Sequence, residues 1–531
     1  MADMRLDRVW AEHVRRMQAF KQRVDPALDL LEKHEPQLAL DKLTYLLEQA
    51  PVEEPDKWQA LLYKSWCYRD LGEAAKCIAY GMEAVHSTEG QMLFTQQKTY
   101  GSLIFYMYET RMSDEELKRA TFAFDELNRE TQVYEHDRKA HRGHEKIRVG
   151  YIASRFTENV LSLFAIQLLC AYDRRRFEVY CYSYADKEDR VTEFIRPLVK
   201  KFYVGPYGSN TPADIMAAEI YEDEVDILFD LSGHTENSLG LIAASYKPAP
   251  VQLTGIGFMG TSGMGAMDYF LGDPYCDPPG LNEDDFREEI LRLPHSHFCY
   301  TPSERAQHIT NQYRPKRPGE EILLASFGNF RKLNEQHVSL WAEILHRLPQ
   351  ARLLLRSSDD NRYMRRKVRE MFRAKGLVDN GRVIIERPDY DYMNRYQDVD
   401  LLLDTYPYVG GGTTCDALYA GVPVISLYGR RHGTRFGYSL LTNAGLGELA
   451  AATEEEYVEK AVALGSDPVL LAALHEKIPG MFRQSPVMDA AGYMRDVQAA
   501  YERIWQTWLT GESGSSERGR EASGEKQLRG Q

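Results

Sequence analysis

The sequence lacks the marks of a membrane-spanning or secreted protein. No run of about eighteen apolar residues occurs, so we expect no segment to span a bilayer. The first residues, MADMRLDRVWAEHVRRMQAF, carry charges throughout and have no apolar stretch of the kind that a signal peptide needs. The seven cysteines show neither CxxC pairs nor metal-ligand spacing, which favours buried thiols in a reducing compartment. These absences predict a cytoplasmic protein.

An excess of basic residues is also absent. The 65 lysines and arginines are outnumbered by 79 aspartates and glutamates, which leaves a net charge of −14. This balance argues against a nucleic acid as the main partner, because phosphate backbones attract basic surfaces. With 43% hydrophobic and 27% charged residues the composition is that of a globular protein. A chain of 531 residues is long enough for about two to four domains.

The pattern of residues 1–140 predicts an α-helical domain. Apolar residues recur three and four apart in PQLALDKLTYLLEQAP and in DKWQALLYKSWCYRDLGEAAKCIAYGMEAV. Trp66, Tyr68, Leu71 and Gly72 resemble the pattern of a tetratricopeptide (TPR) helix hairpin. Such short helices must stack on each other or on the next domain. Two roles stay open for this region: a cap on the following domain, or a peptide-binding surface.

Two α/β segments follow, over residues 147–310 and 318–508. Strand patterns such as IRVGYIA, FEVYCYSY and VDILFDLSG alternate with helical patterns in the first, and ILLASFGNF, ARLLLRSS and VDLLLDTYP do so in the second. This alternation predicts two parallel sheets covered by helices, or two Rossmann-like lobes. Ligands of such lobes bind at the carboxyl ends of strands, here in a cleft between the lobes. Residues 509–531 have almost no apolar side chains and are expected to be disordered.

A glycine- and threonine-rich segment follows the strand VDLLLDTYP. We call Gly410 to Asp416 the Gly–Thr loop; consecutive glycines there allow a ligand to approach the backbone closely. Thr413 and Thr414 can offer hydroxyls and helix-start N–H groups to a phosphate. Asp416, in the first turn of the helix, can accept a hydrogen bond from a ribose hydroxyl. The alternative is an ordinary helix start with an acidic residue near it.

A second candidate lies at the same edge of the sheet. SFGNFRKLNEQ follows the first strand of the second lobe, which places Asn329 and Lys332 at its carboxyl end. A lysine there can stabilise a departing diphosphate. The alternative is a solvated surface lysine.

At this point the chain from about residue 100 to 508 resembles the family of protein O-GlcNAc transferases and SPINDLY proteins, especially its bacterial members. Matching segments occur in the family's order, among them YGSLIFYMYETRMSDEEL, IRVGYIASRF, DILFDLSGHT, KPAPVQLTGIGFMGTSGMGAMDY, LRLPHSHFCY and DVDLLLDTYPYVGGGTTCDALYAGVPVISL. The resemblance implies two lobes of the GT-B type behind helical repeats, and transfer of a sugar from a nucleotide diphosphate sugar, usually UDP-GlcNAc, to Ser or Thr of a protein. It implies no metal and no further cofactor. Some relatives transfer glucose to Asn, and SPINDLY uses GDP-fucose.

The resemblance also assigns residues. Lys332 matches the family's diphosphate lysine and Asp416 its ribose-binding acid, while Tyr392 replaces a His that stacks on the uracil, so stacking could survive with a phenol ring. The residues that it implies for binding the nucleotide sugar are Asn329, Lys332, Arg387, Tyr392, Gly411, Gly412, Thr413, Thr414 and Asp416.

The chain departs from the family at one catalytic motif. The family reads Asp-Phe-x-x-His-Pro after the first strand, whereas this chain has Arg155, Asn159 and Val160 at the Asp, His and Pro positions. In the Gly–Thr loop, Gly412 stands where bacterial members commonly have Thr. Because an Asn side chain cannot take up a proton at neutral pH, no His-based acid/base scheme runs through position 159.

For the histidines outside these segments, a functional role is weighed against a structural one. His234 in DLSGHT ends a strand facing the expected cleft and is a candidate catalytic residue, with a local hydrogen-bonding role as the alternative. His295 and His297 resemble a zinc pair but have no third ligand at useful spacing, which favours packing. His432, among arginines, could meet a phosphate or lie in a solvated basic turn.

The sequence therefore predicts a metal-independent, inverting glycosyltransferase. It would move a sugar, with GlcNAc as the first candidate, from a UDP-sugar to Ser or Thr hydroxyls of a protein or peptide acceptor, with Lys332 and His234 as catalytic residues. Two alternatives stay open. One is a non-catalytic helical-repeat adaptor that keeps a degenerate transferase fold, and the other is a GT-B enzyme with an Asn or small-molecule acceptor.

Overall fold

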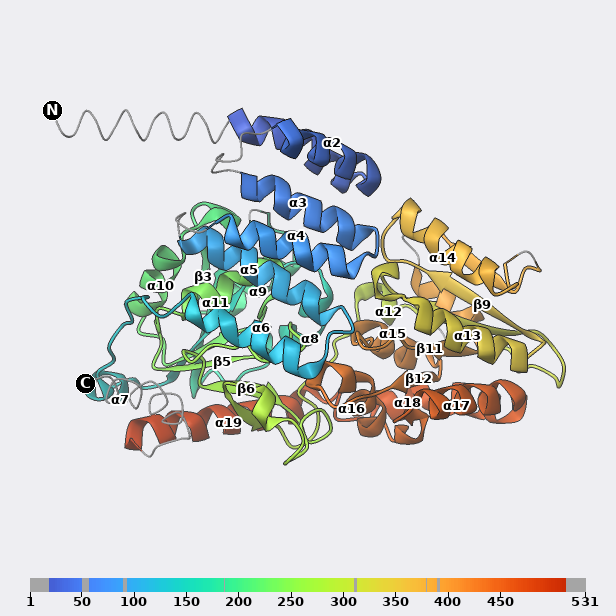
Figure 1. The fold of residues 1–531 in the computed structure, drawn as a ribbon. Helices are drawn as coiled ribbons and strands as arrows, with labels where there is room; N and C mark the ends of the chain where they lie inside the picture. Colours follow the sequence, from blue (N-terminus) through green and yellow to red (C-terminus); the bar gives the residue numbers. More distant parts are fainter. Residues whose placement is uncertain are drawn as a thin grey trace.

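The computed structural model describes residues 19–49, 57–88, 93–185, 187–309, 313–378, 380–388 and 392–511. A helical region at the start of the chain lies across two lobes, each built on a parallel sheet (Figure 1). The expected architecture, two Rossmann-like lobes behind a helical region, is thus confirmed. Most of the tail that we expect to be disordered, residues 512–531, lies outside the described residues.

The helical region consists of antiparallel hairpins. Residues 19–32 are helical, and α3 (Lys57–Asp70) packs against α4 (Ala74–His86) through a turn at Gly72, whose φ of 67° suits glycine. The ring of Tyr68 stacks on Tyr80 with centroids 5.2 Å apart, and Leu71 is buried in the same hairpin. The further helices are α2 (Pro36–Gln49), α3 (Lys57–Asp70), α4 (Ala74–His86), α5 (Leu93–Tyr108) and α6 (Asp114–Glu126).

The N-terminal lobe holds a seven-stranded parallel sheet in the order β3-β2-β1-β4-β5-β6-β7. The strands Ile227–Asp230 and Val251–Thr254 in its middle are buried at every position, as expected when helices cover both faces of a parallel sheet. The strands are β1 (Ile147–Ala153), β2 (Phe177–Ser183), β3 (Lys201–Val204), β4 (Ile227–Asp230), β5 (Val251–Thr254), β6 (Tyr269–Gly272) and β7 (Glu289–Arg292). The helices are α7 (Arg138–Arg142), α8 (Val160–Cys170), α9 (Arg190–Ile195), α10 (Ala213–Glu222), α11 (Leu239–Ala244) and α12 (Glu304–Gln307).

The C-terminal lobe holds a six-stranded parallel sheet in the order β10-β9-β8-β11-β12-β13. Because β9 lies on one side of β8 and β11 on the other, the strand order reverses at β8, and ligands of doubly wound sheets bind at such a point. The strands are β8 (Ile322–Phe327), β9 (Ala351–Arg356), β10 (Val383–Glu386), β11 (Leu401–Leu403), β12 (Val424–Leu427) and β13 (Ala450–Ala451). The helices are α13 (Glu335–Arg347), α14 (Arg362–Ala374), α15 (Gly412–Ala420), α16 (Phe436–Asn443), α17 (Glu454–Ser466) and α18 (Pro468–Arg483).

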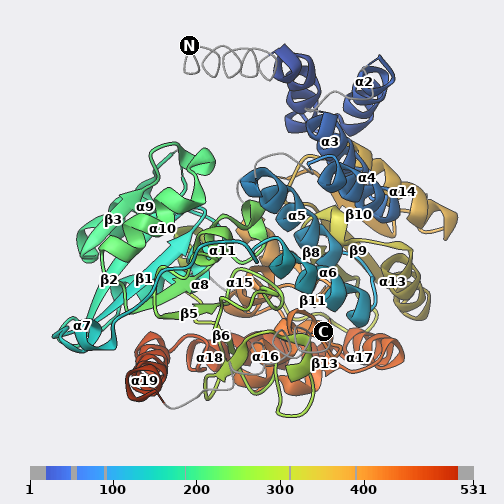
Figure 2. The same cartoon turned by 60° about the vertical axis from the view of Figure 1, so that its left-hand side comes forward.

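The last helix, α19 (Ala490–Thr510), returns to the N-terminal lobe. It lies beside the strands of that lobe in both views (Figures 1 and 2). The hydroxyls of Tyr501 and Tyr151 are 3.1 Å apart, and the side-chain oxygen of Gln498 accepts a hydrogen bond from the Asp173 N–H at 2.7 Å. The range that we expect for the C-terminal lobe, 318–508, therefore includes a helix that packs on the other lobe.

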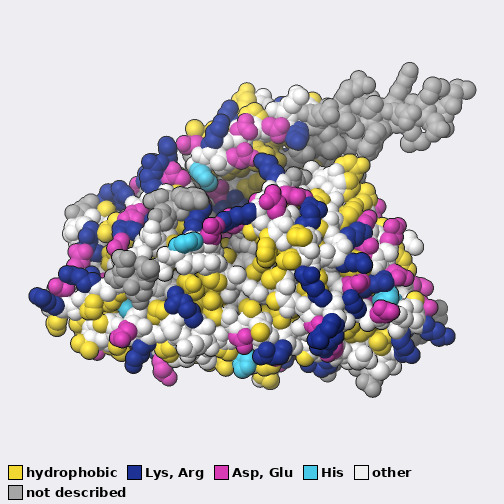
Figure 3. Space-filling model, turned by 180° about the vertical axis from the view of Figure 1, so that it is seen from behind, with side chains coloured by type: hydrophobic (Ala, Val, Ile, Leu, Met, Phe, Trp, Pro, Cys, Tyr) yellow, Lys and Arg dark blue, Asp and Glu magenta, His cyan; other side chains and the backbone are white. Residues whose placement is uncertain are grey.

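The helical region contacts both lobes. On the C-terminal lobe, Asn361 donates to the Asp70 carbonyl at 3.1 Å and Lys367 to the Leu71 carbonyl at 2.9 Å. On the N-terminal lobe, Lys98 donates to the Ser209 carbonyl at 3.1 Å. The described helices include none that is both long and apolar enough to cross a membrane. Basic and acidic side chains are interspersed over the face seen in Figure 3.

Candidate active site

The Gly–Thr loop is folded by a carboxylate that sequence reasoning did not assign. Asp404, directly after β11, accepts hydrogen bonds on Oδ1 from the N–H groups of Thr405 and Gly410, both at 2.8 Å. Its Oδ2 accepts the hydroxyl of Ser426 at 2.8 Å. These bonds tie the start of the loop to the ends of β11 and β12. From the sequence, Asp404 can be recognised only as a polar residue at the end of a strand.

The helix α15 starts without a side-chain cap. Gly411 is its N-cap and offers no side chain to accept the first N–H groups. A Cβ built on Gly410 would lie 2.5 Å from Thr413 Oγ1 and 2.7 Å from Thr414 Oγ1, so only glycine fits there. The hydroxyl of Thr414 donates to the Gly410 carbonyl at 3.1 Å. An ordinary helix start would carry a capping side chain; this one leaves N–H groups available for an anion.

The tip of α15 faces the other lobe. A Cβ built on Gly412 would lie 3.4 Å from Val160 Cγ1, and one on Gly411 3.8 Å from the ring of Phe164. Both neighbours belong to α8. The Gly–Thr loop therefore lies where the two lobes meet.

Lys332 lies at the same edge of the sheet. It ends the 3₁₀ helix η5 (Phe330–Lys332), which follows β8, and β8 pairs in parallel with β11. Its Nζ lies 3.7 Å from the centre of the Tyr408 ring. Burial lowers the pKa of Lys332, while the charge of Asp404 acts in the opposite direction. Burial raises the pKa of Asp404 and Lys332 acts against that shift, so the ammonium and the carboxylate under the Gly–Thr loop are coupled.

Asn329 is engaged locally. Its Oδ1 accepts the N–H of Arg331 at 2.9 Å, which caps η5, and its Nδ2 donates to Asp359 at 2.9 Å. These bonds fix the turn that carries Lys332. The expected contact of Asn329 with a nucleotide stays a prediction.

Asp416 is buried and both its oxygens accept phenol hydroxyls. Tyr300, from the end of the N-terminal lobe, donates to Oδ1 at 2.5 Å, and Tyr392 donates to Oδ2 at 3.2 Å. Burial raises the pKa of Asp416 to about 6. Each oxygen of Asp416 keeps a lone pair that a ribose hydroxyl could use. Tyr300 was not predicted; it lies 116 residues away in sequence, and nothing in its local pattern indicates the contact.

The Arg387 side chain forms no hydrogen bond or ion pair with Asp416, Lys332 or the Gly–Thr loop among the described residues. It follows β10, is exposed, and pairs with Asp360 at 2.9 Å. A backbone contact from the loop that it begins stays a prediction, and part of that loop lies outside the described residues.

His234 is not at the junction of the lobes. Its side chain is fully buried, with Nδ1 2.8 Å from the Ser238 hydroxyl and Nε2 2.9 Å from the Ser262 carbonyl. Since a carbonyl only accepts, Nε2 carries the proton and Nδ1 accepts from Ser238. Burial lowers the pKa of His234 to about 4. Both ring nitrogens are occupied, so the geometry corrects the expected catalytic role to a local hydrogen-bonding one.

The substituted position 159 is structural here. The Asn159 side chain caps α8 by accepting the Ser162 N–H at 3.1 Å, and the Asn159 N–H donates to the Ser162 hydroxyl at 3.3 Å. The side chain at position 159 therefore serves as a helix cap.

Two of the remaining candidate histidines, His432 and His297, pair with carboxylates. Nδ1 of His432 lies 2.8 Å from Asp277 and Nδ1 of His297 lies 2.6 Å from Asp273, whereas His295 is exposed. The zinc pair is therefore not formed. Among the described residues, ligand atoms lie within 4.8 Å of one another in two groups, and hydrogen bonds join members of both. These groups are His141 with His144 and Asp226, and Asp273 with Cys276 and His297.

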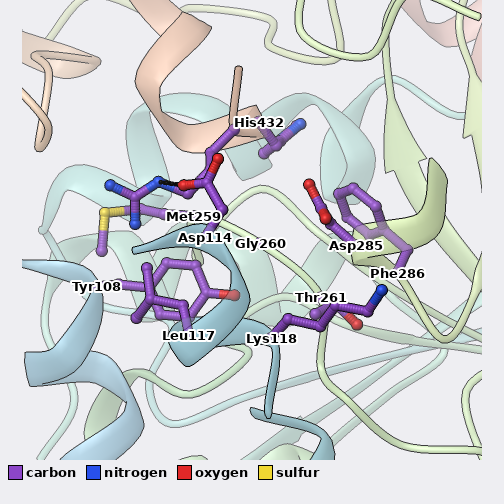
Figure 4. Close-up of a pocket in the computed structure, with 11 residues that line it drawn as sticks. Tyr108, Asp114, Leu117, Lys118, Met259, Gly260, Thr261, Asp285, Phe286 and His432 are labelled. Atoms are coloured by element: carbon purple, nitrogen blue, oxygen red, sulfur yellow. Dashed lines mark ion pairs between the residues drawn. The ribbon is translucent and has the colours of Figure 1, made fainter. Parts of the chain in front are cut away.

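A cavity lies where the helical region, the N-terminal lobe and the segment after β12 of the C-terminal lobe meet (Figure 4). Tyr108 and Asp114 approach it from the helical region, and Met259 and Phe286 from the lobe. Arg431 pairs with Asp114 there, with Nε 3.1 Å from Oδ1. No residue of the Gly–Thr loop lines this cavity, so it is separate from the diphosphate candidate.

The fold and this site are those of a glycosyltransferase family. The profile described as "Glycosyl transferase family 41" matches residues 106–315 and 303–497, and the chain belongs to that family. The probable UDP-N-acetylglucosamine–peptide N-acetylglucosaminyltransferase SPINDLY of Hordeum vulgare is 35% identical over 374 residues, which is 69% of this chain and 39% of that protein. Its Arabidopsis thaliana counterpart is 34% identical over 377 residues, with 69% and 40% covered.

One solved structure shares the whole fold. A mutant of the Thermobaculum terrenum O-GlcNAc transferase matches with a TM-score of 0.71 and 24% identity, covering 94% of this chain and 99% of that one. The resemblance noted in the sequence is confirmed by these matches, and so is the GT-B fold. The chain spans about two fifths of the length of the curated relatives just named.

Proposed function

We propose that this protein transfers a sugar, with GlcNAc as the first candidate, from a UDP-sugar to Ser or Thr hydroxyls of a protein or peptide. The observation that carries the proposal is that Lys332 follows β8 and the uncapped start of α15 follows β11, two neighbouring parallel strands, so that both lie at one edge of the sheet. Membership of family 41 supports it, as do the names of the relatives, which specify UDP-N-acetylglucosamine and peptide.

The chemistry follows from the charges. A UDP-sugar brings a diphosphate with two negative charges, and further charge develops on it as the bond to the sugar breaks. The Lys332 ammonium and the first N–H groups of α15 would stabilise that charge. The partly buried setting strengthens both interactions. Substrate charge near Lys332 would raise its lowered pKa and keep it protonated.

A cytoplasmic location is part of this proposal. All seven cysteines are free and all except Cys170 are buried, as expected of thiols kept reduced. Nucleic acid is not proposed as a partner, given the net charge of −14.

The test is transfer of label from radioactive UDP-GlcNAc to protein. Lys332→Ala should abolish incorporation, whereas Lys375→Ala, at an exposed lysine after α14, should not change it. A wild-type protein that transfers no sugar from any of a panel of nucleotide sugars would contradict the proposal.

A second candidate is a non-catalytic adaptor. Two observations favour it: Asn159 caps a helix where the family has a histidine, and Asp416 already holds two phenols. It predicts capture of protein partners through the helical region without turnover of any donor.

A further inference from the structure

Tyr300 lies in the segment that connects the two lobes, between β7 and α12. Its N–H donates to the Val487 carbonyl at 2.7 Å, and the N–H of the next residue, Thr301, donates to the Leu163 carbonyl of α8 at 2.7 Å. Gln167, also of α8, donates to the Thr301 hydroxyl at 2.9 Å. The backbone at Tyr300 is therefore fixed against both α8 and the segment before α19.

The Tyr300 side chain is fixed as well. It is buried, and the centre of its ring lies 6.2 Å from that of Phe164, 6.3 Å from that of Tyr419 and 6.0 Å from that of Phe482. Phe164 belongs to α8 and also faces Gly411, the N-cap of α15. The helices α8 and α15 lie next to each other in Figures 1 and 2. The Tyr300 ring thus lies where the connecting segment, α8 and α15 meet.

The Tyr300 hydroxyl makes the shorter of the two hydrogen bonds to Asp416. It donates to Oδ1 at 2.5 Å, whereas Tyr392, the first residue of the 3₁₀ helix η6 (Tyr392–Asp398), donates to Oδ2 at 3.2 Å. Among the described residues, no lysine, arginine or histidine forms an ion pair with Asp416. A buried carboxylate that holds hydroxyl donors and no cation keeps lone pairs for a further hydroxyl.

The position of Asp416 on α15 suits a ribose. Four residues separate it from Gly412, which is about 6 Å along the helix axis. The same helix therefore offers open N–H groups at its tip and a carboxylate about one turn behind them. In a nucleoside diphosphate the ribose is bonded directly to the diphosphate. A diphosphate held at the tip of α15 would bring the ribose hydroxyls within reach of Asp416.

We propose that Tyr300 is a positioning residue for the nucleotide: its hydroxyl holds the Asp416 carboxylate in the orientation that accepts a ribose hydroxyl. The segment between the lobes thereby takes part in selecting a ribonucleotide. This inference rests on the proposed function. Tyr300 acts through Asp416, and without its hydroxyl only the longer bond from Tyr392 would orient the carboxylate.

Protonation of Asp416 would remove the acceptor. Burial raises the pKa of Asp416 to about 6, and the hydrogen bonds from Tyr300 and Tyr392 act against that shift. The other titratable groups that face Asp416 are Tyr396 of η6 and Cys415 of α15, and burial raises the pKa of both, so they are uncharged at neutral pH. The preference for a ribonucleotide should therefore be lost as the pH falls through about 6. Removal of the Tyr300 hydroxyl should move this loss to higher pH.

The experiment compares UDP with 2′-deoxy-UDP and 3′-deoxy-UDP by calorimetry at pH 8, on the full chain of wild type, Tyr300→Phe and Tyr184→Phe. Tyr184→Phe is the matched control, because it removes a buried hydroxyl that donates to the Leu239 carbonyl at 3.2 Å within the N-terminal lobe. Wild type should bind UDP at least about tenfold more tightly than the deoxynucleotide that lacks the bonded hydroxyl. Tyr300→Phe should reduce this ratio to a few fold by weakening UDP alone, and Tyr184→Phe should keep the wild-type ratio.

Two further measurements do not depend on Tyr300→Phe alone. In wild type the ratio of affinities should fall toward one between pH 8 and pH 5. In Asp416→Asn the ratio should be close to one already at pH 8. Adding Tyr300→Phe to that variant should not change the ratio, because the two side chains act as one unit.

The outcomes are distinct. If Tyr300→Phe keeps the wild-type ratio, or weakens UDP and both deoxynucleotides equally, Tyr300 has a structural role only and the inference is wrong. A wild type that binds UDP and transfers sugar but prefers UDP to neither deoxynucleotide, or keeps its preference at pH 5, would also overturn the inference while the proposed function stands. A wild type that neither binds UDP nor transfers sugar would instead end the proposed function.

Discussion

Replacing Asp416 with asparagine should make the protein more stable at neutral pH and a weaker nucleotide binder. Asp416 is 4% exposed, and its hydrogen-bond donors are the two phenols of Tyr300 and Tyr392. Burial disfavours its charged form and raises its pKa from 3.8 to about 6. An Asn side chain has the same shape, can accept one phenol and donate to the other, and carries no charge.

The size and sign of the effect follow from the pKa. A shift of about two units corresponds to about 3 kcal/mol of destabilisation once the carboxylate is fully ionised. The folded-state pKa is raised, so the native state binds the proton more tightly and the destabilisation grows as pH rises from about 3.8 to about 6. At pH 7 Asp416→Asn should gain up to about 3 kcal/mol over wild type, and at pH 4 the two should differ little.

Urea unfolding of both proteins at pH 4 and pH 7 provides the measurement, with Glu370→Gln as the control because Glu370 is exposed. A stability difference that is the same at both pH values would refute the reasoning. UDP calorimetry on the same variant tests function: loss of a charge-assisted bond to ribose should weaken binding by about tenfold or more.

Three further perturbations follow from the geometry. Gly410→Ala would place a Cβ 2.5 Å from Thr413 Oγ1. The free energy of unfolding, measured by thermal unfolding, should therefore fall by about 1–3 kcal/mol, and UDP affinity should fall with it. An unchanged Tm would contradict the packing of the loop. His234→Ala should lower the free energy of unfolding by about 1–3 kcal/mol, because the buried Ser262 carbonyl loses its hydrogen-bond donor. The pH profile of sugar transfer by the folded variant should match that of wild type. A shifted profile would show that His234 takes part in catalysis. Tyr501→Ala, in α19, should lower the free energy of unfolding, measured by chemical denaturation, by about 3–5 kcal/mol because Tyr501 is buried. A much smaller decrease would mean that this helix packs weakly on the N-terminal lobe.

The two lobes could be predicted from sequence because strand and helix patterns alternate in runs of distinct period. The destination of α19 could not, since an amphipathic helix shows that one face is buried but not against which lobe. The pairing of Tyr501 with Tyr151 joins residues 350 positions apart, and no local signal encodes it.

Part of the candidate site, too, could be predicted from the sequence, and part could not. Lys332 and the Gly–Thr loop could be placed together because both follow parallel strands, and β8 and β11 prove to be neighbours. Asp404 was missed because its role is to accept N–H groups inside the loop, which a pattern of residue types does not show. His234 was misplaced because a polar residue after a strand can turn either toward the junction of the lobes or into the lobe; here Ser238 and Ser262 hold it inside.

The central claim, that Lys332 and the tip of α15 hold a diphosphate, is tested most directly by calorimetry with UDP and with uridine on wild type and Lys332→Ala. Wild type should bind UDP at one site per chain and much more tightly than uridine, and Lys332→Ala should remove most of that difference while uridine affinity stays the same. Equal affinities of wild type for UDP and uridine, or a difference that survives the substitution, would contradict the account.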